Sequence, residues 1–288
     1  MTIWNLGSIN TDIIYSVPHI PAPGETLSST GRSVFLGGKG ANMSVAAARA
    51  GAHVRHIGAI APESKWTRDR LLEYGVDTRS VIEIDADPAQ AIISVAEDGE
   101  NAILLHTGAN GAIPEDHVKQ SLTEAEVGDW VVAQNETNAQ HTALALGKEM
   151  GLRVAYAAAP FSAEAVQSVL SLLDFLILNE IEMAQLSDAL GKSASELGIE
   201  TVIVTKGADG ADLYRNGEMS HFDALPVTPV DTTGAGDTFT GYVLAGLDRG
   251  LPVEQAVQLA IKASALMVTR KGTADVIPDL LDVQEFRP

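Results

Sequence analysis

Short apolar runs of strand length alternate with helix-length segments along much of the chain, and this alternation limits the fold more than any other feature. Strands are expected at residues 3–9, 54–60, 130–133, 154–156, 175–178 and 202–204, and helices at 137–150 and 163–173 between them. Strands that are separated by helices usually pair in parallel, with helices covering both faces of the sheet. The sequence therefore predicts an α/β fold with a mostly parallel central sheet.

A glycine-rich turn at residues 231–239 lies between two different kinds of segment. Residues 225–230 place valines beside prolines, as in a short edge strand or its end, and residues 240–250 have helical spacing. A glycine turn that leads into a helix presents free backbone N–H groups and the positive end of the helix dipole, which together form an anion site. The spacing of the glycines fits neither a Walker loop nor a dinucleotide-binding fingerprint.

One carboxylate, Asp237, falls in the first turn of that helix. In a positive pocket it stays ionised and can accept a proton, as a general base does. Acids are also common at helix starts for purely structural reasons, so position alone leaves both roles open. Asp12, after the first strand, is similarly either a turn residue or an acceptor for two hydroxyls of a ligand.

Composition excludes several classes of function. The net charge is −19 and no block of Lys and Arg is present, which argues against binding to nucleic acid or to an anionic membrane surface. The absence of Cys excludes disulfides and Cys-based zinc sites. The N-terminal residues do not resemble a signal peptide, and no apolar run approaches the roughly 20 residues that cross a bilayer, so a cytoplasmic location is expected.

Four stretches resemble the ribokinase-type carbohydrate kinase family. Residues 231–239 resemble its C-terminal signature and residues 37–42 its N-terminal signature, while 7–12 and 268–272 resemble further family segments. They occur in family order and span nearly the whole chain. The resemblance implies one three-layer α/β/α domain over 1–288, with a small β-sheet lid from about 13–36 and 89–107. The hairpin that the pattern predicts at 91–105 falls in that lid.

The resemblance also implies ATP-dependent phosphorylation of a primary sugar hydroxyl, with ribose as the expected sugar. The implied catalytic groups are Asp237 as base and an anion hole of Gly234, Ala235 and Gly236. The implied sugar contacts are Asn10, Asp12, Gly38, Lys39, Asn42 and Glu136, together with Asp237. The implied nucleotide contacts are Asn179, Thr205, Gly207, Gly210 and Gly236. Mg²⁺ is implied near Glu182, held through water, and K⁺ near Asp231, Thr233, Met267, Arg270 and Gly272.

Three departures from the family pattern stand out. Residues 61–66 lack the usual acidic residue and glycine, the segment 183–201 is short, and Val276 replaces a usual hydroxyl residue, which puts activation by K⁺ in doubt. The alternatives are a nucleoside kinase, a fructose or deoxyribose kinase, and a sugar-binding regulator without turnover. Family membership further implies a homodimer through the lid.

Overall fold

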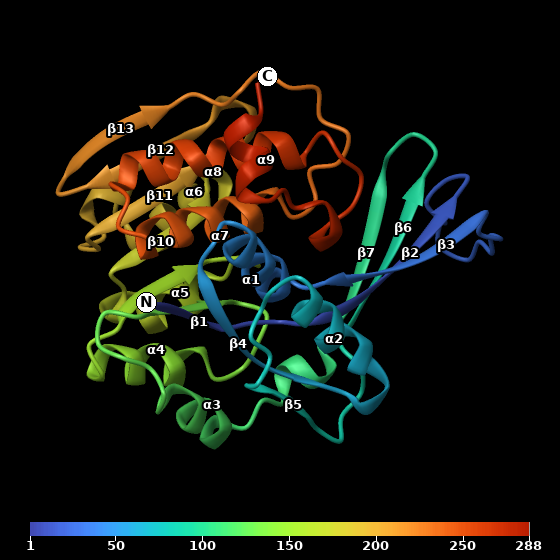
Figure 1. Cartoon of the computed structure of the whole chain (residues 1–288). Coiled ribbons are helices and arrows are strands. Elements are labelled where there is room, and N and C mark those ends of the chain that lie inside the picture. Colours follow the sequence, from blue (N-terminus) through green and yellow to red (C-terminus); the bar gives the residue numbers. More distant parts are fainter. Residues whose placement is uncertain (288) are drawn as a thin grey trace.

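The computed structural model describes residues 1–287, which form two β-sheets (Figure 1). The larger sheet has nine strands in the order β13-β12-β11-β10-β9-β8-β1-β4-β5. They are β1 (Thr2–Leu6), β4 (His53–Ile60), β5 (Val81–Glu83), β8 (Trp130–Gln134), β9 (Arg153–Ala157), β10 (Phe175–Asn179), β11 (Thr201–Thr205), β12 (Ala211–Arg215) and β13 (Glu218–Phe222). Only the two pairings of β12, with β11 and with β13, are antiparallel, so the predicted mostly parallel sheet is confirmed.

Helices cover both faces of this sheet. One face carries α1 (Lys39–Arg49), α2 (Lys65–Glu73), α7 (Ala235–Asp248), α8 (Val253–Met267) and α9 (Leu280–Glu285); the other carries α3 (Glu115–Leu122), α4 (Gln140–Glu149), α5 (Ala163–Val169) and α6 (Glu180–Leu190). Neighbouring strand residues point to opposite faces, so Ile3 joins the first core and Trp4 the second. The three-layer α/β/α architecture is confirmed.

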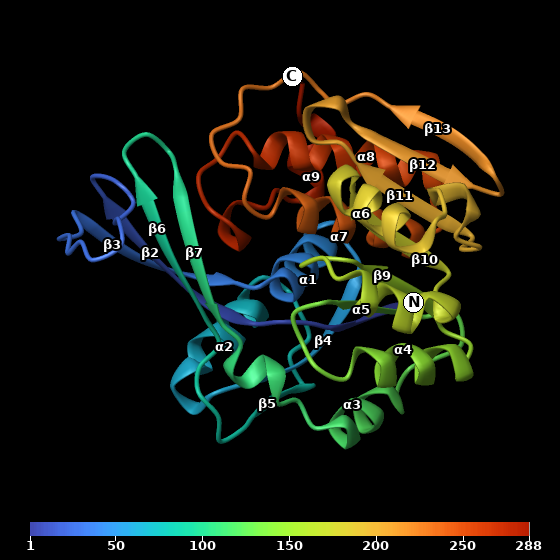
Figure 2. The same ribbon diagram turned by 180° about the vertical axis from the view of Figure 1, so that it is seen from behind.

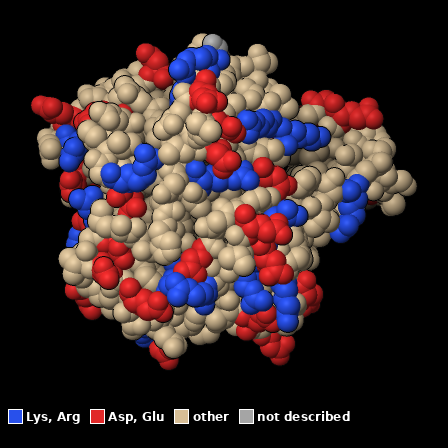
Figure 3. Space-filling view, in the orientation of Figure 1, with Lys and Arg blue, Asp and Glu red and all other residues tan. Residues whose placement is uncertain are grey.

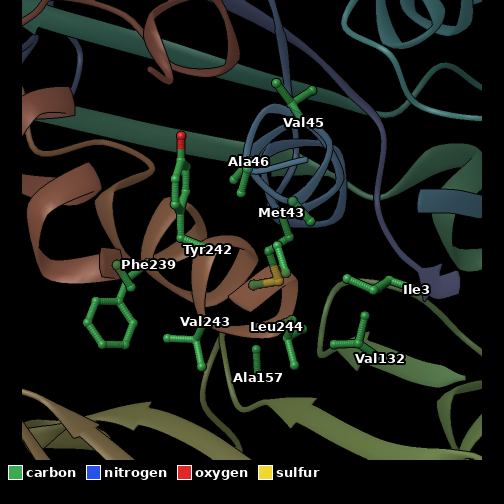
Figure 4. Packing of buried hydrophobic residues seen from close by; sticks show 14 of the residues in the cluster. Ile3, Met43, Val45, Ala46, Val132, Ala157, Phe239, Tyr242, Val243 and Leu244 are labelled. Carbon is green, nitrogen blue, oxygen red and sulfur yellow. The ribbon is translucent and has the colours of Figure 1, made fainter. Parts of the chain in front are cut away.

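Helix α7 is buried between α1 and the sheet. Gly241 makes the close approach of α1 possible, because a Cβ atom there would lie 2.5 Å from the Cβ of Ala46. Figure 4 shows labelled side chains of two helices and the sheet meeting in one core: Met43 and Ala46 from α1, Val243 and Leu244 from α7, and Val132 and Ala157 from the sheet. This packing fixes the position of the first turn of α7.

The smaller sheet has four strands in the order β3-β2-β6-β7. They are β2 (Asn10–Val17), β3 (Gly31–Gly37), β6 (Gln90–Ala96) and β7 (Asn101–His106), so two distant parts of the chain form it. Figures 1 and 2 show it protruding from the body, attached where β2 and β7 meet the rest of the chain. This is the small sheet that the resemblance predicted, and we call it the lid.

The expected edge strand at 225–230 is wrong, because residues 223–229 have no regular secondary structure. Pro226 and Pro229 cannot donate to a strand ladder, which explains why the segment does not pair. The sheet instead gains the β12–β13 hairpin, which the sequence pattern did not reveal. In the short segment after Glu182, α6 ends at Leu190 and a single 3₁₀ turn follows at Ala194–Glu196.

Two observations concern membrane spanning and nucleic-acid binding, against which the sequence argues. None of the helices in residues 1–287 is long and apolar enough to cross a membrane. Figure 3 shows acidic and basic side chains interspersed over the face seen in Figure 1, without one continuous basic surface. That distribution agrees with the sequence argument against nucleic acid, which requires a basic footprint.

Candidate active site

The first turn of α7 presents a carboxylate together with free backbone donors. Gly234 precedes the helix with φ of 77°, and Asp237 follows in the first turn with only 6% of its surface exposed. Gly234 and Gly236 donate no hydrogen bond within residues 1–287, whereas the N–H of Ala235 donates to the Thr232 carbonyl at 3.2 Å. Two of the three predicted anion-hole donors are therefore free, and the third has a partner in this state.

The Asp237 carboxylate is held by two neighbours from α1. Asn42 donates from Nδ2 to Asp237 Oδ2 at 2.9 Å, and the half-buried Lys39 lies close enough for its charge to act on the carboxylate. Burial raises the pKa of Asp237, while Lys39 and the hydrogen bond from Asn42 oppose that rise. A buried carboxylate stabilised in this way is suited to accept a proton near neutral pH.

Two further carboxylates face the same space. Asp12 on β2 is 7% exposed, and its Oδ1 atom has no hydrogen-bond partner in residues 1–287. Burial, and then the charges of Glu136 and Asp237, raise the pKa of Asp12 to about 7. Glu136 accepts hydrogen bonds from Ser8 Oγ at 2.5 Å and from the N–H of Lys39 at 3.0 Å. The predicted sugar contacts from three distant segments thus lie together.

A cavity of about 340 Å³ opens at the base of the lid, next to Glu136. Asn10 and Glu136 line it, together with His106, Asn110 and other polar residues. Asn110 is a site residue that sequence reasoning missed: it donates to Asn10 Oδ1 at 2.7 Å and accepts from the N–H of Ile9 at 3.0 Å. No periodicity marks such an asparagine, so only its structural context reveals it.

A second cavity of about 370 Å³ lies on the other side of the α7 turn. Its lining includes four predicted nucleotide contacts: Thr205, Gly207, Gly210 and Gly236. The segment that was expected to be an edge strand instead supplies an apolar wall, with Leu225 and Val227, opposite Phe239 of α7. Sequence reasoning missed this wall. The α7 turn therefore borders the largely apolar cavity through Ala235 and Gly236, and the charge of Glu136, which lines the polar cavity, acts on Asp237.

Asn179 and Glu182 form a capping box at the start of α6. Asn179 Oδ1 accepts from the N–H of Glu182 at 2.8 Å, and Glu182 Oε2 accepts from the N–H of Asn179 at 2.7 Å. The spacing of Asn179 and Glu182 therefore serves to cap helix α6. Within the described part of the chain, residues 1–287, Glu182 Oε1 has no hydrogen-bond partner, and the charge of Lys39 acts on Glu182. No cluster of three acidic or imidazole ligands occurs among residues 1–287, so this oxygen would reach a metal only with other ligands or water.

The predicted cation residues also converge. Asp231 accepts from the N–H of Thr233 at 2.9 Å and from the N–H of Gly272 at 3.2 Å, which ties the two loops together. The carbonyls of Thr233, Arg270 and Gly272 accept no hydrogen bond within residues 1–287, whereas that of Met267 accepts from the Arg270 N–H at 2.9 Å. Carboxylate and carbonyl oxygens are the ligands that hard cations take.

Val276 lies against this group. A Cβ atom on Gly272 would be 3.1 Å from a methyl carbon of Val276, so the two residues are in contact. The neighbouring Asp275 carboxylate accepts a hydrogen bond from the Tyr74 hydroxyl, so it already has a partner of its own.

Comparison with known proteins gives consistent matches. The model of the pfkB family carbohydrate kinases matches residues 3–280. The ribokinase of Haemophilus influenzae is 36% identical over 99% of this chain and 98% of its own length. The structure of a Cryptococcus neoformans ribokinase in complex with ADP has a TM-score of 0.84 at 32% identity, covering 99% of this chain and 98% of that one. An Arabidopsis thaliana ribokinase complexed with ribose and ATP has a TM-score of 0.86 at 27% identity, covering 99% of both chains.

Proposed function

Because this chain belongs to the pfkB family of carbohydrate kinases and is an ATP-dependent sugar kinase, we propose that it phosphorylates the primary hydroxyl of ribose. The observation that carries this proposal is the buried Asp237 carboxylate at the start of α7: Ala235 and Gly236, just before it, line the apolar cavity, and the charge of Glu136, which lines the polar cavity, acts on it. Ribose would occupy the polar side and ATP the other, so that the hydroxyl, the carboxylate and the γ-phosphoryl group meet at the glycine turn.

Asp237 is the proposed general base. As the oxygen of the sugar hydroxyl forms its bond to the γ-phosphorus, the hydroxyl proton passes to Asp237, and the bond from that phosphorus to the bridging oxygen breaks to release ADP. Negative charge develops on the phosphoryl oxygens in the transition state. The free N–H groups of Gly234 and Gly236 are placed to stabilise that charge. The N–H of Ala235 can donate to a phosphoryl oxygen while it also donates to the Thr232 carbonyl.

Ribose is held by the polar groups around the first cavity. Asp12 Oδ1, which has no partner among residues 1–287, is the proposed acceptor for sugar hydroxyls, together with Asn10 and Glu136 of the cavity and with Asn42, which contacts Asp237. The backbone at Gly38 and the Lys39 side chain complete this side. No Phe, Tyr or Trp lines the cavity, which favours a sugar over a nucleoside, whose base commonly stacks on an aromatic ring.

ATP would lie against Thr205, Gly207, Gly210 and Gly236, with its adenine beside the apolar wall at 225–227. Asn179 contributes by holding the start of α6. Bound Mg²⁺ supplies charge neutralisation to the phosphates, and Glu182 Oε1 is the oxygen of this chain that would hold it through water.

A panel of ribose, deoxyribose, fructose and adenosine, each with ATP and Mg²⁺, tests the substrate. We expect the highest kcat/KM for ribose. A preference for adenosine would identify a nucleoside kinase, and a preference for fructose or deoxyribose would identify another sugar kinase of the family. Binding of ribose without any turnover would support the sugar-binding regulator. A cytoplasmic location stays a prediction.

We expect K⁺ to activate the enzyme, but with weaker binding than a site with a hydroxyl ligand would give. The free carbonyls of Thr233, Arg270 and Gly272, with the Asp231 carboxylate, provide oxygen ligands, and the Met267 carbonyl lies in the same loop. A cation there would strengthen the field of the adjacent glycine turn. The measurement is turnover against KCl, with ionic strength held constant by a large organic cation.

Val276→Ser should move the activation curve to lower KCl, because it restores a hydroxyl next to Gly272. Val276→Ala is the matched control, since it removes the methyl groups without adding an oxygen. A flat curve for the wild type would mean that no cation acts here. Equal curves for the serine and alanine variants would show that residue 276 supplies no ligand.

The lid is the proposed surface of a homodimer. Strand pairing aligns Val34, Ile13, Ile92 and Leu104 in one row across all four strands. Side chains alternate along a strand, so this row lies on the face opposite to Asp12, and Leu104 is 67% exposed. A row of exposed apolar side chains of this kind is typical of an interface.

Leu104→Lys should shift the dimer to monomers in sedimentation equilibrium, because it places a charge at the most exposed end of the apolar row. Val127→Lys, a change at an even more exposed apolar residue of the body, is the control and should leave the dimer intact. A monomeric wild type at micromolar concentration would overturn the proposal.

A further inference from the structure

We propose that a buried hydrogen-bonded chain of four side chains, Gln134, Asn5, Ser44 and His56, positions the backbone segments that bind the sugar. This inference rests on the proposed function, and it assigns a role to residues that lie behind the site and touch no substrate. The chain runs from the end of β8 through β1 and α1 to β4. It is called the Asn5–His56 network below.

Every link of the network is a normal hydrogen bond. Gln134 Nε2 donates to Asn5 Oδ1 at 2.8 Å, and Asn5 Nδ2 donates both to Ser44 Oγ at 2.8 Å and to the Gly40 carbonyl at 2.8 Å. Ser44 Oγ lies 2.8 Å from His56 Nδ1, and His56 Nε2 lies 3.0 Å from the Gly7 carbonyl. The network therefore ends on two backbone carbonyls, those of Gly7 and Gly40.

The directions of these bonds follow from the partners. A carbonyl only accepts, so the hydrogen of the imidazole must be on Nε2, and Nδ1 must accept from the Ser44 hydroxyl. All four side chains are at most 1% exposed, so water cannot replace any missing bond. Burial lowers the pKa of His56 to about 4, which keeps the ring in the neutral form that this pattern requires.

The two carbonyls belong to segments that carry the proposed sugar contacts. Gly7 precedes Asn10 and Asp12, whereas Gly40 lies between Lys39 and Asn42. The two glycine backbones are in direct contact, because a Cβ atom on Gly40 would lie 2.3 Å from the Gly7 Cα. With no side chains between them, their relative position depends on the groups behind them, which are Asn5 and His56.

The third sugar-side segment is attached to the same network. Gln134 is the last residue of β8, two residues before Glu136. Ser8, next to Gly7, accepts from the N–H of Gly40 at 3.2 Å and donates to Glu136. A shift of either glycine would therefore change the distances among Asp12, Glu136 and Asn42.

An apolar cluster could fill this space with comparable stability, because buried polar networks add little net free energy of folding. Such a network, in which Gln134 Oε1 is a buried atom without a partner among residues 1–287, provides one defined geometry. The expected signature is a change in the kinetics for the sugar beyond any change in thermal stability.

His56→Phe, which keeps a ring but removes both hydrogen bonds, should raise the KM for ribose about tenfold and leave the KM for ATP within about twofold. His56→Gln places an amide donor near the former Nε2 and should restore part of the ribose affinity. His117→Phe is the matched control: His117 also contacts a carbonyl, that of Ser80 at 2.9 Å, but stands outside the network. It should leave the KM for ribose unchanged.

Ser44→Ala is the second variant, because it removes only the link between Asn5 and His56. It replaces His56→Phe as the test if His56→Phe does not fold. A several-fold increase in the KM for ribose, with that for ATP unchanged, supports the network. If the folded His56 and Ser44 variants keep the wild-type KM for ribose, or change both KM values alike, the inference is wrong. Failure of the wild type to phosphorylate any pentose would instead contradict the proposed function.

Discussion

Asp237→Asn should lower kcat by roughly 10²–10⁴-fold, the range for loss of a general base, and leave the binding of ribose and ATP largely intact. The amide has the size of the carboxylate and can still contact Asn42, but it cannot accept a proton at neutral pH. The carboxylate is buried beside Ala235 and Gly236, which line the apolar cavity, so water cannot easily take its place. Steady-state kinetics and calorimetric titration of each ligand measure the two effects separately.

Asp248→Asn is the matched control for that experiment. Asp248 lies in the last turn of the same helix, and burial raises its pKa as it does that of Asp237. It is at the other end of α7, so its loss should not change kcat. Near-normal turnover of Asp237→Asn, or an equal loss in both variants, would remove Asp237 from the proposed mechanism.

Asp12→Ala should weaken ribose binding on the order of 10²-fold and leave ATP binding within about twofold, because an acceptor that bonds two hydroxyls in a buried site is lost. Asp12 Oδ1 has no protein partner and is available to a ligand. Asp87→Ala is the control, since Asp87 faces His106 at the mouth of the polar cavity but is exposed. If the variant weakens the binding of ribose and of ATP equally, or weakens neither, Asp12 is a structural turn residue.

The same carboxylate makes sugar binding depend on pH. Its pKa of about 7 means that the ionised, accepting form increases as the pH rises from about 6 to 8, so ribose affinity should rise over that range. Without ligand, the same group gives folding stability the opposite dependence on pH. The pKa of Asp12 is raised above the unfolded value of 3.8, so the contribution of Asp12 to folding stability is complete below pH 3.8 and is lost as the pH rises through about 7. Asp12→Asn should abolish the slope in ribose affinity; a slope that persists would assign it to another group.

The order of the layers could be predicted from the sequence because the spacing of apolar residues within each segment is enough to identify a strand or a helix. Alternating strands and helices give a parallel sheet with two covered faces, and the apolar side chains at alternate strand positions divide between two cores, as Ile3 and Trp4 do. The segment 225–230 misled the prediction because its valines suggest a strand, whereas its prolines prevent pairing and leave it as a pocket wall.

The site was less predictable, since its charges come from segments far apart in the sequence. Periodicity says nothing about the proximity of Asp12, Glu136 and Asp237, and only the family resemblance grouped them. The raised pKa of Asp12, the partner of the Ala235 N–H and the bonds of Asn110 depend on three-dimensional contacts. His56 carries no sequence signal at all, because a histidine in a strand is usually a structural residue.

The most direct test of the central claim is to identify the product. The wild-type protein is incubated with ribose, ATP and Mg²⁺, and the position of the new phosphate ester is assigned by coupled ³¹P and ¹H nuclear magnetic resonance. The proposed geometry predicts one ribose phosphate, esterified at the primary hydroxyl, in a one-to-one ratio with ADP. Release of ADP without a sugar phosphate, or a phosphate on a secondary hydroxyl, would contradict it.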